Sequence, residues 1–423
     1  VVLYAATWLP HFYFKSGIID PTFNFFIFLS FFQLHLISYG KKDVMHAILC
    51  GLFLGLAVLT KGPVVILVAL LSFAIYVIVN RGTKGVNLKH LLLIVLFSLL
   101  TTSLWFGVEI LNHGFWFVKE FITYQVRLFR TEDADHGGPF FYHWIVLLIG
   151  CFPASLFLFQ YNRKRSTDIE STRNFTRLMW IMFWVVLILF SIVKTKIVHY
   201  SSLCYFPLTY LAALQLYRLS ANQAILKPWV KALLLFVGSL LALLIAALPL
   251  VGIYKDKLIP YIDDPFAVGN LQANVPWSYL ECGWGLLYLV GIWVAVILMK
   301  RNFRKGMLVL CVLQILIIQV TVLHFTPKVE AYSQRAAIDF FKDLRGKDVY
   351  VHVLGYKSYA PLFYTEKMPP ANKNSYNEQW LLNGNVDKPT YFVCKIQNAD
   401  KFRVMPQLQE LYAKNGFVFF KRK

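Results

Sequence analysis

The sequence predicts an all-α polytopic membrane protein with about ten to eleven membrane-spanning helices, followed by a small C-terminal α/β domain. Three observations lead to this fold class. Hydrophobic residues make up 58% of the 423 residues and charged residues only 15%, which excludes an ordinary soluble domain. Apolar stretches of membrane-spanning length follow one another through residues 1–325. Basic residues gather in alternate connections between these stretches, which gives the helices one consistent orientation.

A stretch of roughly 17–25 apolar residues is needed to cross about 30 Å of hydrocarbon. On that basis the sequence predicts helices over residues 22–39, 44–60, 63–80, 90–111, 143–160, 177–193, 198–217, 230–253, 278–299 and 307–324. Residues 1–11 resemble the end of one more helix. Because the chain starts Val-Val-Leu-Tyr, without a methionine or a signal peptide, we expect a further segment to precede residue 1.

The basic residues of alternate loops set the predicted orientation. One set of loops is rich in lysine and arginine and poor in acids, so the positive-inside rule places it in the cytoplasm. Its basic residues are Lys41, Lys42, Arg81, Lys84, Lys89, Arg163, Lys164, Arg165, Arg173, Arg177, Arg218, Lys227, Lys231, Lys300, Arg301, Arg304 and Lys305. The other loops, including residues 112–142, mix both signs of charge with aromatics and prolines. We expect these loops, and everything after Phe325, on the outer side.

The same architecture explains the net charge of +20 and the cysteines. Lysine and arginine accumulate in cytoplasmic loops of membrane proteins, and we prefer this explanation to nucleic-acid binding. The six cysteines have no Cys-x-x-Cys or Cys/His spacing, so neither a disulfide framework nor a zinc site is predicted. The sequence also contains no Gly-x-Ser-x-Gly, His-Glu-x-x-His or P-loop motif. Serine hydrolysis, zinc proteolysis and ATP-driven work therefore have no support.

From Thr326 the composition becomes that of a soluble domain, residues 326–423. Helical spacing predicts a helix over residues 331–344, and alternation predicts strands over residues 348–354, 388–395 and 416–420. We also predict a helix over residues 408–414. Residues 367–388 look irregular, as a loop over the membrane face would.

Two ionisable residues stand at predicted helix ends on the outer side. Asp20 precedes Pro21 at the start of a helix, where it could cap the helix or act as a base, and the two roles are compatible. Lys61 joins two apolar helices in Thr60-Lys61-Gly62-Pro63 with almost no loop. It either snorkels to the outer surface or meets an anion there.

Further lysines and arginines are predicted on the outer side. Lys194 and Lys196 lie in another very short outer connection, which suggests a ligand that carries phosphate. Arg127 and Arg130 are three residues apart and share one face if residues 117–129 form an amphipathic helix in the interface. Pairing of these arginines with lipid headgroup phosphates is the alternative.

The acids and the histidine of the loop after Arg130 are ambiguous. Glu132, Asp133 and Asp135 suit a solvated turn, as do Asp263 and Asp264 in a later outer loop. His136 begins His-Gly-Gly-Pro, where an imidazole could bind a metal, although a histidine without spaced partners is more often structural.

These segments together resemble a known family. Four segments, in this order, look like those of bacterial polyprenyl-phosphate-sugar glycosyltransferases. They are Asp20-Pro21, Gly55-Leu-Ala-Val-Leu-Thr-Lys61-Gly-Pro63, His136-Gly-Gly-Pro-Phe-Phe-Tyr142 and Lys196-Ile-Val-His-Tyr200 to Pro207. That group includes the lipid A aminoarabinose transferases and relatives of the protein O-mannosyltransferases. The resemblance covers residues 1–325. The C-terminal domain is similar to the outer domain of the same family in one stretch, Val353-Leu-Gly-Tyr-Lys-Ser-Tyr359 to Phe363-Tyr364.

The resemblance implies a GT-C fold in a bacterial inner (plasma) membrane and an inverting transfer at its outer face. The donor would be a sugar on a polyprenyl (undecaprenyl) phosphate, and the acceptor a lipid such as lipid A, a glycan or a protein. Asp20 matches the second acidic position of the family, whereas the first acidic loop has no counterpart in this chain. Lys61, Lys196 and Arg127, or else Arg130, would bind the donor phosphate, with His136, Lys194 and Tyr200 lining the site. The resemblance does not fix a cofactor, and a divalent metal is compatible with it.

The residues themselves agree with this chemistry. Transfer from a lipid phosphate needs a carboxylate that accepts the acceptor's proton and cations that stabilise the departing phosphate. A transporter or flippase of a lipid-linked sugar is the main alternative. Transporters usually carry polar groups near the bilayer midplane on broken helices of paired halves, whereas here the charges stand at helix ends. An assembly scaffold would explain the C-terminal domain but not the lysines.

Overall fold

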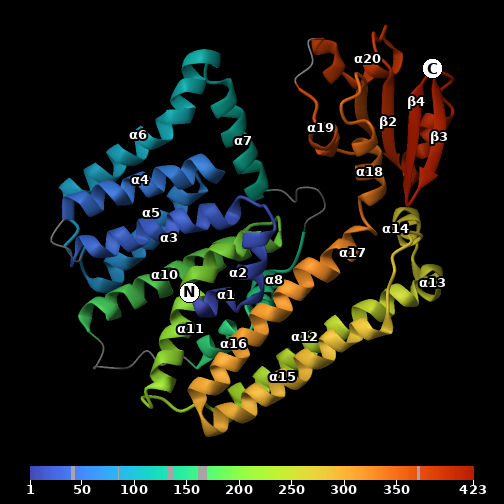
Figure 1. The fold of residues 1–423 in the computed structure, drawn as a ribbon. Coiled ribbons are helices and arrows are strands. Elements are labelled where there is room, and N and C mark those ends of the chain that lie inside the picture. The colour runs from blue at the N-terminus through green and yellow to red at the C-terminus, as the bar shows by residue number, and fades with distance from the viewer. Residues whose placement is uncertain (40–42, 84, 131–136, 161–168, 369–371) are drawn as a thin grey trace. The chain divides into compact units, whose positions relative to one another are not determined.

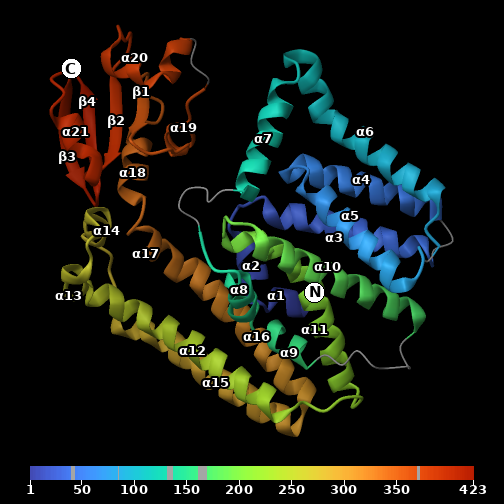
Figure 2. The same cartoon turned by 180° about the vertical axis from the view of Figure 1, so that it is seen from behind.

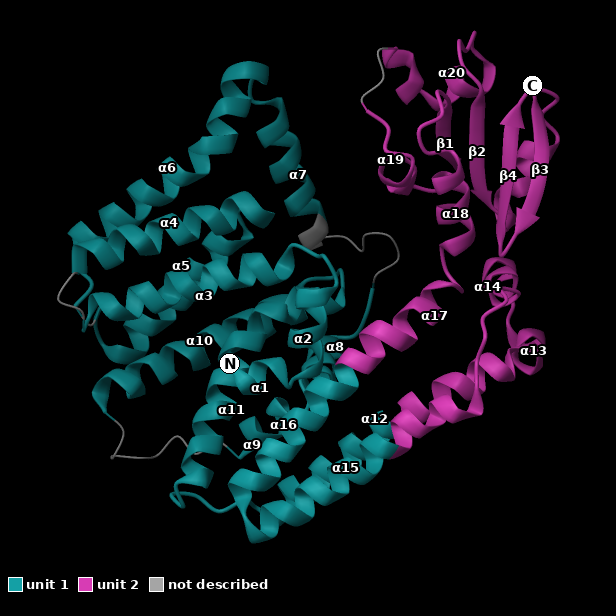
Figure 3. Ribbon diagram, in the orientation of Figure 1, with its two compact units in different colours: residues 1–242, 287–318 teal, residues 243–286, 319–423 magenta. Residues whose placement is uncertain are grey.

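The structure is a computed structural model that describes residues 1–39, 43–83, 85–130, 137–160, 169–368 and 372–423, apart from the side chains of residues 128–130. The chain divides into two compact units (Figure 3). The first unit comprises residues 1–242 and 287–318, and the second comprises residues 243–286 and 319–423. The boundaries fall within helices α12 (Pro228–Ile253), α15 (Cys282–Arg301) and α16 (Phe303–Val320).

The described part of the first unit is helical (Figure 1). Besides the helices shared with the second unit, its elements are α1 (Val2–Ala5), α2 (Trp8–Lys15), α3 (Asp20–Ile37), α4 (Asp43–Lys61), α5 (Val64–Asn80), α6 (Leu88–His113), α7 (Trp116–Arg130), α8 (Tyr142–Gly150), α9 (Ala154–Phe159), α10 (Glu170–Ile192), the 3₁₀ turn η1 (Val198–Cys204) and α11 (Tyr205–Ser220). Both views place α3, α4 and α6 in one layer of neighbouring helices (Figures 1 and 2).

Helix α4 approaches α6 closely because small residues face the contact. A Cβ atom on Gly51 would lie 2.4 Å from the carbonyl oxygen of Ile94, and one on Gly55 would lie 2.6 Å from Cβ of Thr101. The two glycines are one turn apart, the spacing that lets apolar helices approach within a membrane. This contact fixes α4, and therefore the lysine at its C-terminal end.

The predicted spans coincide with helical structure, but two of them are interrupted. The range 143–160 is divided into α8 and α9 around Pro153, which has no backbone N–H to continue a helix. The range 198–217 begins with η1 before α11 starts at Tyr205. Among the described residues, 6 helices are long and apolar enough to cross a membrane, or up to 7 if the bent pair α2 and α3 counts as one span. The chain is thus a multi-pass membrane protein.

The second unit contains a sheet and short helices. Its elements outside the shared helices are α13 (Lys255–Leu258), η2 (Ile259–Tyr261), α14 (Pro265–Leu271), η3 (Tyr279–Glu281), the π-helical turn η4 (Thr321–Phe325), α17 (Thr326–Glu330), α18 (Arg335–Asp343), β1 (Tyr350–Leu354), α19 (Ala360–Tyr364), η5 (Lys373–Tyr376), α20 (Glu378–Asn383), β2 (Thr390–Lys395), η6 (Ile396–Asn398), α21 (Ala399–Arg403), β3 (Leu408–Lys414) and β4 (Phe417–Arg422). The strand order is β1-β2-β4-β3, with β1 and β2 parallel and the other pairs antiparallel.

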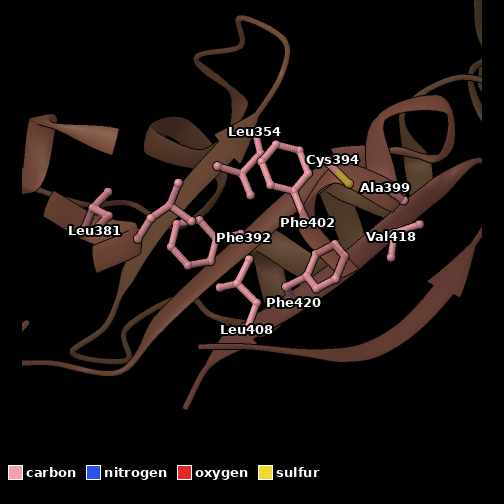
Figure 4. Close-up of a cluster of buried hydrophobic side chains, with 10 residues drawn as sticks. Leu354, Leu381, Phe392, Cys394, Ala399, Phe402, Leu408, Val418 and Phe420 are labelled. Carbon is pink, nitrogen blue, oxygen red and sulfur yellow. The ribbon is translucent and has the colours of Figure 1, made fainter. Parts of the chain in front are cut away.

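Both faces of this sheet are covered. Phe392 and Cys394 of β2 point into one core with residues of α20 and α21 (Figure 4). Val393, between them, points to the opposite core with Phe340 and Phe341 of α18. Alternate residues of a strand face opposite sides, so β2 must be apolar throughout. The strands predicted over residues 348–354, 388–395 and 416–420 are confirmed, as is the helix within 331–344.

The helix predicted over residues 408–414 is wrong, because this segment is strand β3. Its leucine, glutamate, alanine and lysine favour helix by propensity, but Asn415 and Gly416 follow with φ of 48° and 78°. An Asn-Gly pair with both residues at positive φ forms the tight turn of a hairpin, and it pairs β3 with β4. Residues 367–388 are also less irregular than predicted, since their described part contains η5 and α20.

Candidate active site

Asp20 and Lys61 form an ion pair that joins the start of α3 to the end of α4. Nζ of Lys61 donates to Oδ1 of Asp20 at 2.5 Å. Ile19 occupies the cap position of α3, and the side chain of Asp20 makes no capping hydrogen bond. The side chains of Asp20 and Lys61 are only 6% and 24% exposed, so the pair is largely shielded from water. Shielding strengthens the attraction between the two charges, and it makes each one costly to leave alone.

The turn after Lys61 is shaped by Gly62. Its φ of 107° lies in a region that side chains rarely adopt, and α5 begins two residues later. Pro63 occupies the cap position of α5. The segment Thr60-Lys61-Gly62-Pro63 therefore places Lys61 at the C-terminal end of α4, and α5 begins almost immediately after it.

A cavity of about 370 Å³ opens beside the ion pair. Both partners line it, together with apolar residues of α3 and α5 such as Ile27, Val64 and Val68. The cavity volume falls in the range typical of small-molecule sites, and its walls combine apolar surface with a few charged groups. Such a site suits a ligand with an apolar part and an anionic head.

The 3₁₀ turn η1 forms a further wall through His199 and Tyr200. The ring of Tyr200 lies 5.5 Å from Nζ of Lys61, and the ring of Phe23 lies 5.9 Å from it. Nδ2 of Asn24 donates to Oγ of Ser202 at 2.8 Å, which ties α3 to this turn. The lysine is thus held between a carboxylate and two aromatic rings.

His199 of η1 also lines the cavity. Burial lowers the pKa of His199 below its usual value, and the nearby Lys61 lowers it further, while Asp20 acts in the opposite direction. A neutral imidazole can donate from one nitrogen and accept at the other. The lowered pKa favours the neutral form of His199, which adds a hydrogen-bonding group to the cavity.

Helix α7 supplies the side of the cavity formed by Tyr124 and Gln125. A surface helix over residues 117–129 is confirmed by α7, Trp116–Arg130. Arg127 is exposed on this helix, and its guanidinium lies 5.1 Å from the ring centre of Tyr124. The structure therefore places Arg127 next to a lining residue rather than in the lining itself. The side chain of Arg130, and the whole of His136, lie outside the described residues.

Lys196 is buried against the end of α10. Its Nζ donates to the carbonyl oxygens of Ser191 and Val193, each at 2.6 Å, and to that of Phe190 at 3.1 Å. Carbonyls at the C-terminal end of a helix have no partner within the helix, and a cation there is favourable. Burial lowers the pKa of Lys196. Lys194, two residues earlier, is exposed.

Gly138, the second glycine of the His-Gly-Gly-Pro motif, packs against Lys196. A Cβ atom on Gly138 would lie 3.0 Å from Cγ of Lys196, tighter than ordinary contacts. Gly138 therefore packs closely against the aliphatic part of the Lys196 side chain.

The structure thus brings Asp20, Lys61 and Tyr200 to one cavity, and it adds groups that the sequence analysis did not select. Asn24 and His199 are the main additions. An asparagine one turn after Asp20 in an apolar helix was a usable signal, because polar groups within membrane helices are costly and usually functional. Within the described residues, no group of three or more His, Cys, Asp or Glu could hold a metal ion.

Comparison with known proteins gives relatives for both sequence and fold. No protein-family model matches the chain. It is 27% identical over 226 residues to the undecaprenyl phosphate-alpha-4-amino-4-deoxy-L-arabinose arabinosyl transferase of Wigglesworthia glossinidia brevipalpis, a match over 50% of this chain and 38% of the relative. The transferases of the same name from Enterobacter sp. (strain 638) and Pectobacterium carotovorum are 31% identical over 204 residues and 27% identical over 293 residues. Those two matches cover 47% and 63% of this chain, and 36% and 51% of the relatives.

Among solved structures, ArnT from Cupriavidus metallidurans bound to undecaprenyl phosphate superposes with a TM-score of 0.74 at 17% identity, covering 99% of this chain and 77% of that one. The chain has the fold of ArnT. The apo state of the same protein matches with a TM-score of 0.67 at 16% identity, over 95% of this chain and 74% of that one. The resemblance to polyprenyl-phosphate-sugar glycosyltransferases that the short motifs suggested is confirmed. The chain spans between about a third and a half of the length of the first curated relatives it matches.

Proposed function

We propose that the protein is an integral-membrane glycosyltransferase that moves a sugar from an undecaprenyl phosphate donor to an acceptor at the outer face of the bacterial inner membrane. The observation that carries the proposal is the ion pair of Asp20 and Lys61 on the wall of a largely apolar cavity. A carboxylate and an ammonium side by side match the two charge needs of transfer from a lipid phosphate. The names of the relatives support an aminoarabinose donor.

In the proposed reaction, Asp20 acts as the base. The acceptor oxygen attacks the anomeric carbon of the sugar, the bond between that carbon and the phosphate oxygen breaks, and the electron pair leaves with the phosphate. The proton of the acceptor hydroxyl passes to the carboxylate of Asp20. The products are the glycosylated acceptor, inverted at the anomeric carbon, and undecaprenyl phosphate. Such a base contributes roughly 10²–10⁴-fold to a rate.

Lys61 stabilises the leaving phosphate in this scheme. An ammonium carries three donors, and one of them is used by Asp20. The others are available to phosphate oxygens, whose negative charge grows as the bond to the sugar breaks. The ion pair also prevents Lys61 from swinging away, so the cation is positioned before the donor arrives.

The remaining cations and polar groups are proposed in supporting roles. Arg127, or Arg130 in its place, and Lys196 would add positive charge near the donor phosphate. Lys196 does so while it caps α10. Tyr200 lines the cavity beside Lys61, and we propose supporting roles for Lys194 and His136 in donor binding. A divalent metal remains compatible with the reaction, although nothing in the scheme depends on it.

We further propose a topology of about ten to eleven spans for residues 1–325. Helices α5 and α11 and the pair α8 and α9 are each short, but they fall where the alternation of basic loops requires a crossing. On this topology Asp20, Lys61 and the loop of residues 112–142 face outward. Residues 326–423 then form a soluble domain on the extracytoplasmic side. The acceptor would be lipid A, another lipid, a glycan or a protein.

The test is donor turnover by the full-length protein in detergent or vesicles. With a labelled undecaprenyl-phosphate aminoarabinose donor and lipid A, we expect release of undecaprenyl phosphate and labelling of the acceptor. Lys61→Ala should abolish release, whereas Lys119→Ala, at an exposed position of α7, should not change it. Translocation of the donor across vesicles without any release would instead identify a flippase and overturn the proposal.

A further inference from the structure

The second unit contains a pocket of its own, of about 320 Å³. It lies beyond the C-terminal ends of the parallel strands β1 and β2, since the loop after β1 and the last residue of β2 line it. Helices α14, α18 and α19, the segment before α18 and the first residue of β4 complete the walls. In open α/β sheets, ligands bind outside the carboxyl ends of parallel strands. All of its walls belong to the second unit.

The pocket is positively charged. Lys357 and Lys395 line it, and no acidic side chain among the described residues does. Lys395 is half-buried, and its Nζ lies 4.7 Å from the ring centre of Phe266 and 5.7 Å from that of Tyr356. In the described chain, no ion pair joins either lysine to a carboxylate. A cation that is held between rings without a counter-ion leaves its charge available to an anionic ligand.

The pocket also contains a buried polar group that lacks a partner. Asn270 of α14 is 7% exposed, and its Oδ1 accepts no hydrogen bond from the described residues. Gly416, which does not line the pocket, lies on another side of this atom, since a Cβ atom on Gly416 would lie 3.3 Å from it. An unsatisfied buried acceptor is rare in proteins, and Asn270 therefore contributes a polar side chain with an unpaired acceptor to the lining of the pocket.

We propose that this pocket binds a phosphorylated saccharide. The phosphate would pair with Lys395 and Lys357, the apolar face of the sugar ring would pack on Tyr356 and Phe266, and a ring hydroxyl would contact the side chain of Asn270. The pocket volume is at the small end of ligand sites and suits one sugar phosphate. The ligand is bound here and undergoes no reaction. The inference goes beyond the proposed function, because it concerns the second unit alone and does not require transfer in the first.

Binding to the full chain in detergent tests the inference, measured by titration calorimetry with N-acetylglucosamine 1-phosphate. We expect saturable binding, with inorganic phosphate and N-acetylglucosamine each at least tenfold weaker because each supplies only half of the contacts. Lys395→Gln should weaken binding at least tenfold. Lys401→Gln, an exposed lysine of α21 outside the pocket, is the matched control and should bind like the unchanged protein.

Two further variants keep the test decisive if Lys395→Gln does not fold. Lys357→Gln removes a positive charge from an exposed position, and Asn270→Asp adds a negative charge to the pocket lining without changing the size of the side chain. Both should weaken binding. Absence of saturable binding, equal binding of inorganic phosphate alone, or unchanged binding by the folded pocket variants would overturn the inference.

The source of the sugar phosphate is settled by competition. Vesicles that contain lipid A, whose head is a phosphorylated sugar, are compared with vesicles of phosphatidylglycerol. Displacement by the lipid A vesicles alone identifies a lipid-borne sugar phosphate as the ligand. Retention of the soluble probe in both cases identifies free sugar phosphates, and either result supports the pocket. Displacement by both vesicles equally would show a general anion surface and would contradict it. Loss of transfer activity changes none of these outcomes, so the two proposals fail separately.

Discussion

A Cβ atom on Gly62 would lie 2.5 Å from Cζ of Phe121, so the turn after Lys61 touches helix α7 where only a glycine fits. This contact has a consequence for the cavity. Phe121 precedes Tyr124 by one helical turn, and Tyr124 and Gln125 line the cavity beside Lys61. The position of the turn after Lys61 and that of α7 are therefore linked through Gly62.

Gly62→Ala should destabilise the protein and reduce donor turnover. The positive φ alone costs about 1–3 kcal/mol for a residue with a side chain, and the contact with Phe121 adds to this. Gly17→Ala is the matched control, since Gly17 has a φ of 66° but nothing within 4 Å of its Cβ position. We expect a larger fall in melting temperature for Gly62→Ala than for Gly17→Ala. Equal falls would show that the contact with α7 contributes nothing.

Lys196→Met should lower the melting temperature even without a donor. The change removes the ammonium that satisfies three carbonyls at the end of α10, and their loss should cost roughly 1–3 kcal/mol. Lys194→Met, at an exposed position, is the control. Thermal unfolding of the donor-free protein measures the difference. If Lys196→Met reduced transfer but left the melting temperature unchanged, Lys196 would serve the donor alone and not the helix.

Acidification should destabilise the protein through His199. Its pKa is lowered in the folded state, by burial first and then by Lys61, relative to 6.5 in the unfolded chain. Between those two values the unfolded chain binds more protons, so stability falls as the pH drops below about 6.5 and levels off below the folded pKa. His199→Gln should remove this part of the pH dependence. The melting temperatures of both proteins at pH 7.5 and 5.5 test it, and an identical loss on acidification would contradict the assignment.

Much of the fold could be predicted because it depends on local composition. Apolar stretches long enough to cross a membrane gave the helices of the first unit, since a backbone within lipid has few alternatives to a helix. Strand β3 could not be predicted in the same way, because its residues favour helix and only its pairing with β4 makes it a strand. The Asn415-Gly416 pair, which is typical of a hairpin turn, is the sequence feature that indicates a strand before it.

The candidate site was predictable in its charges but not in its contacts. Asp20 and Lys61 were selected because each stands at a helix end, yet nothing in the sequence shows that they pair, since 41 residues separate them. Lys196 was predicted as a phosphate ligand, and only the structure shows that it caps α10. The sequence does not predict His199 as a site residue, because its role depends on its distance from Lys61. Contacts between distant residues are set by helix packing, which composition does not reveal.

The most direct test of the central claim is donor turnover by Asp20→Asn, with donor binding measured on the same full-length protein. Asparagine keeps the size of the side chain but cannot accept the acceptor's proton as a base. We predict that donor affinity changes only a few-fold, while release of undecaprenyl phosphate falls at least about 100-fold. Asp20→Asn that releases undecaprenyl phosphate at the unchanged rate would contradict the account.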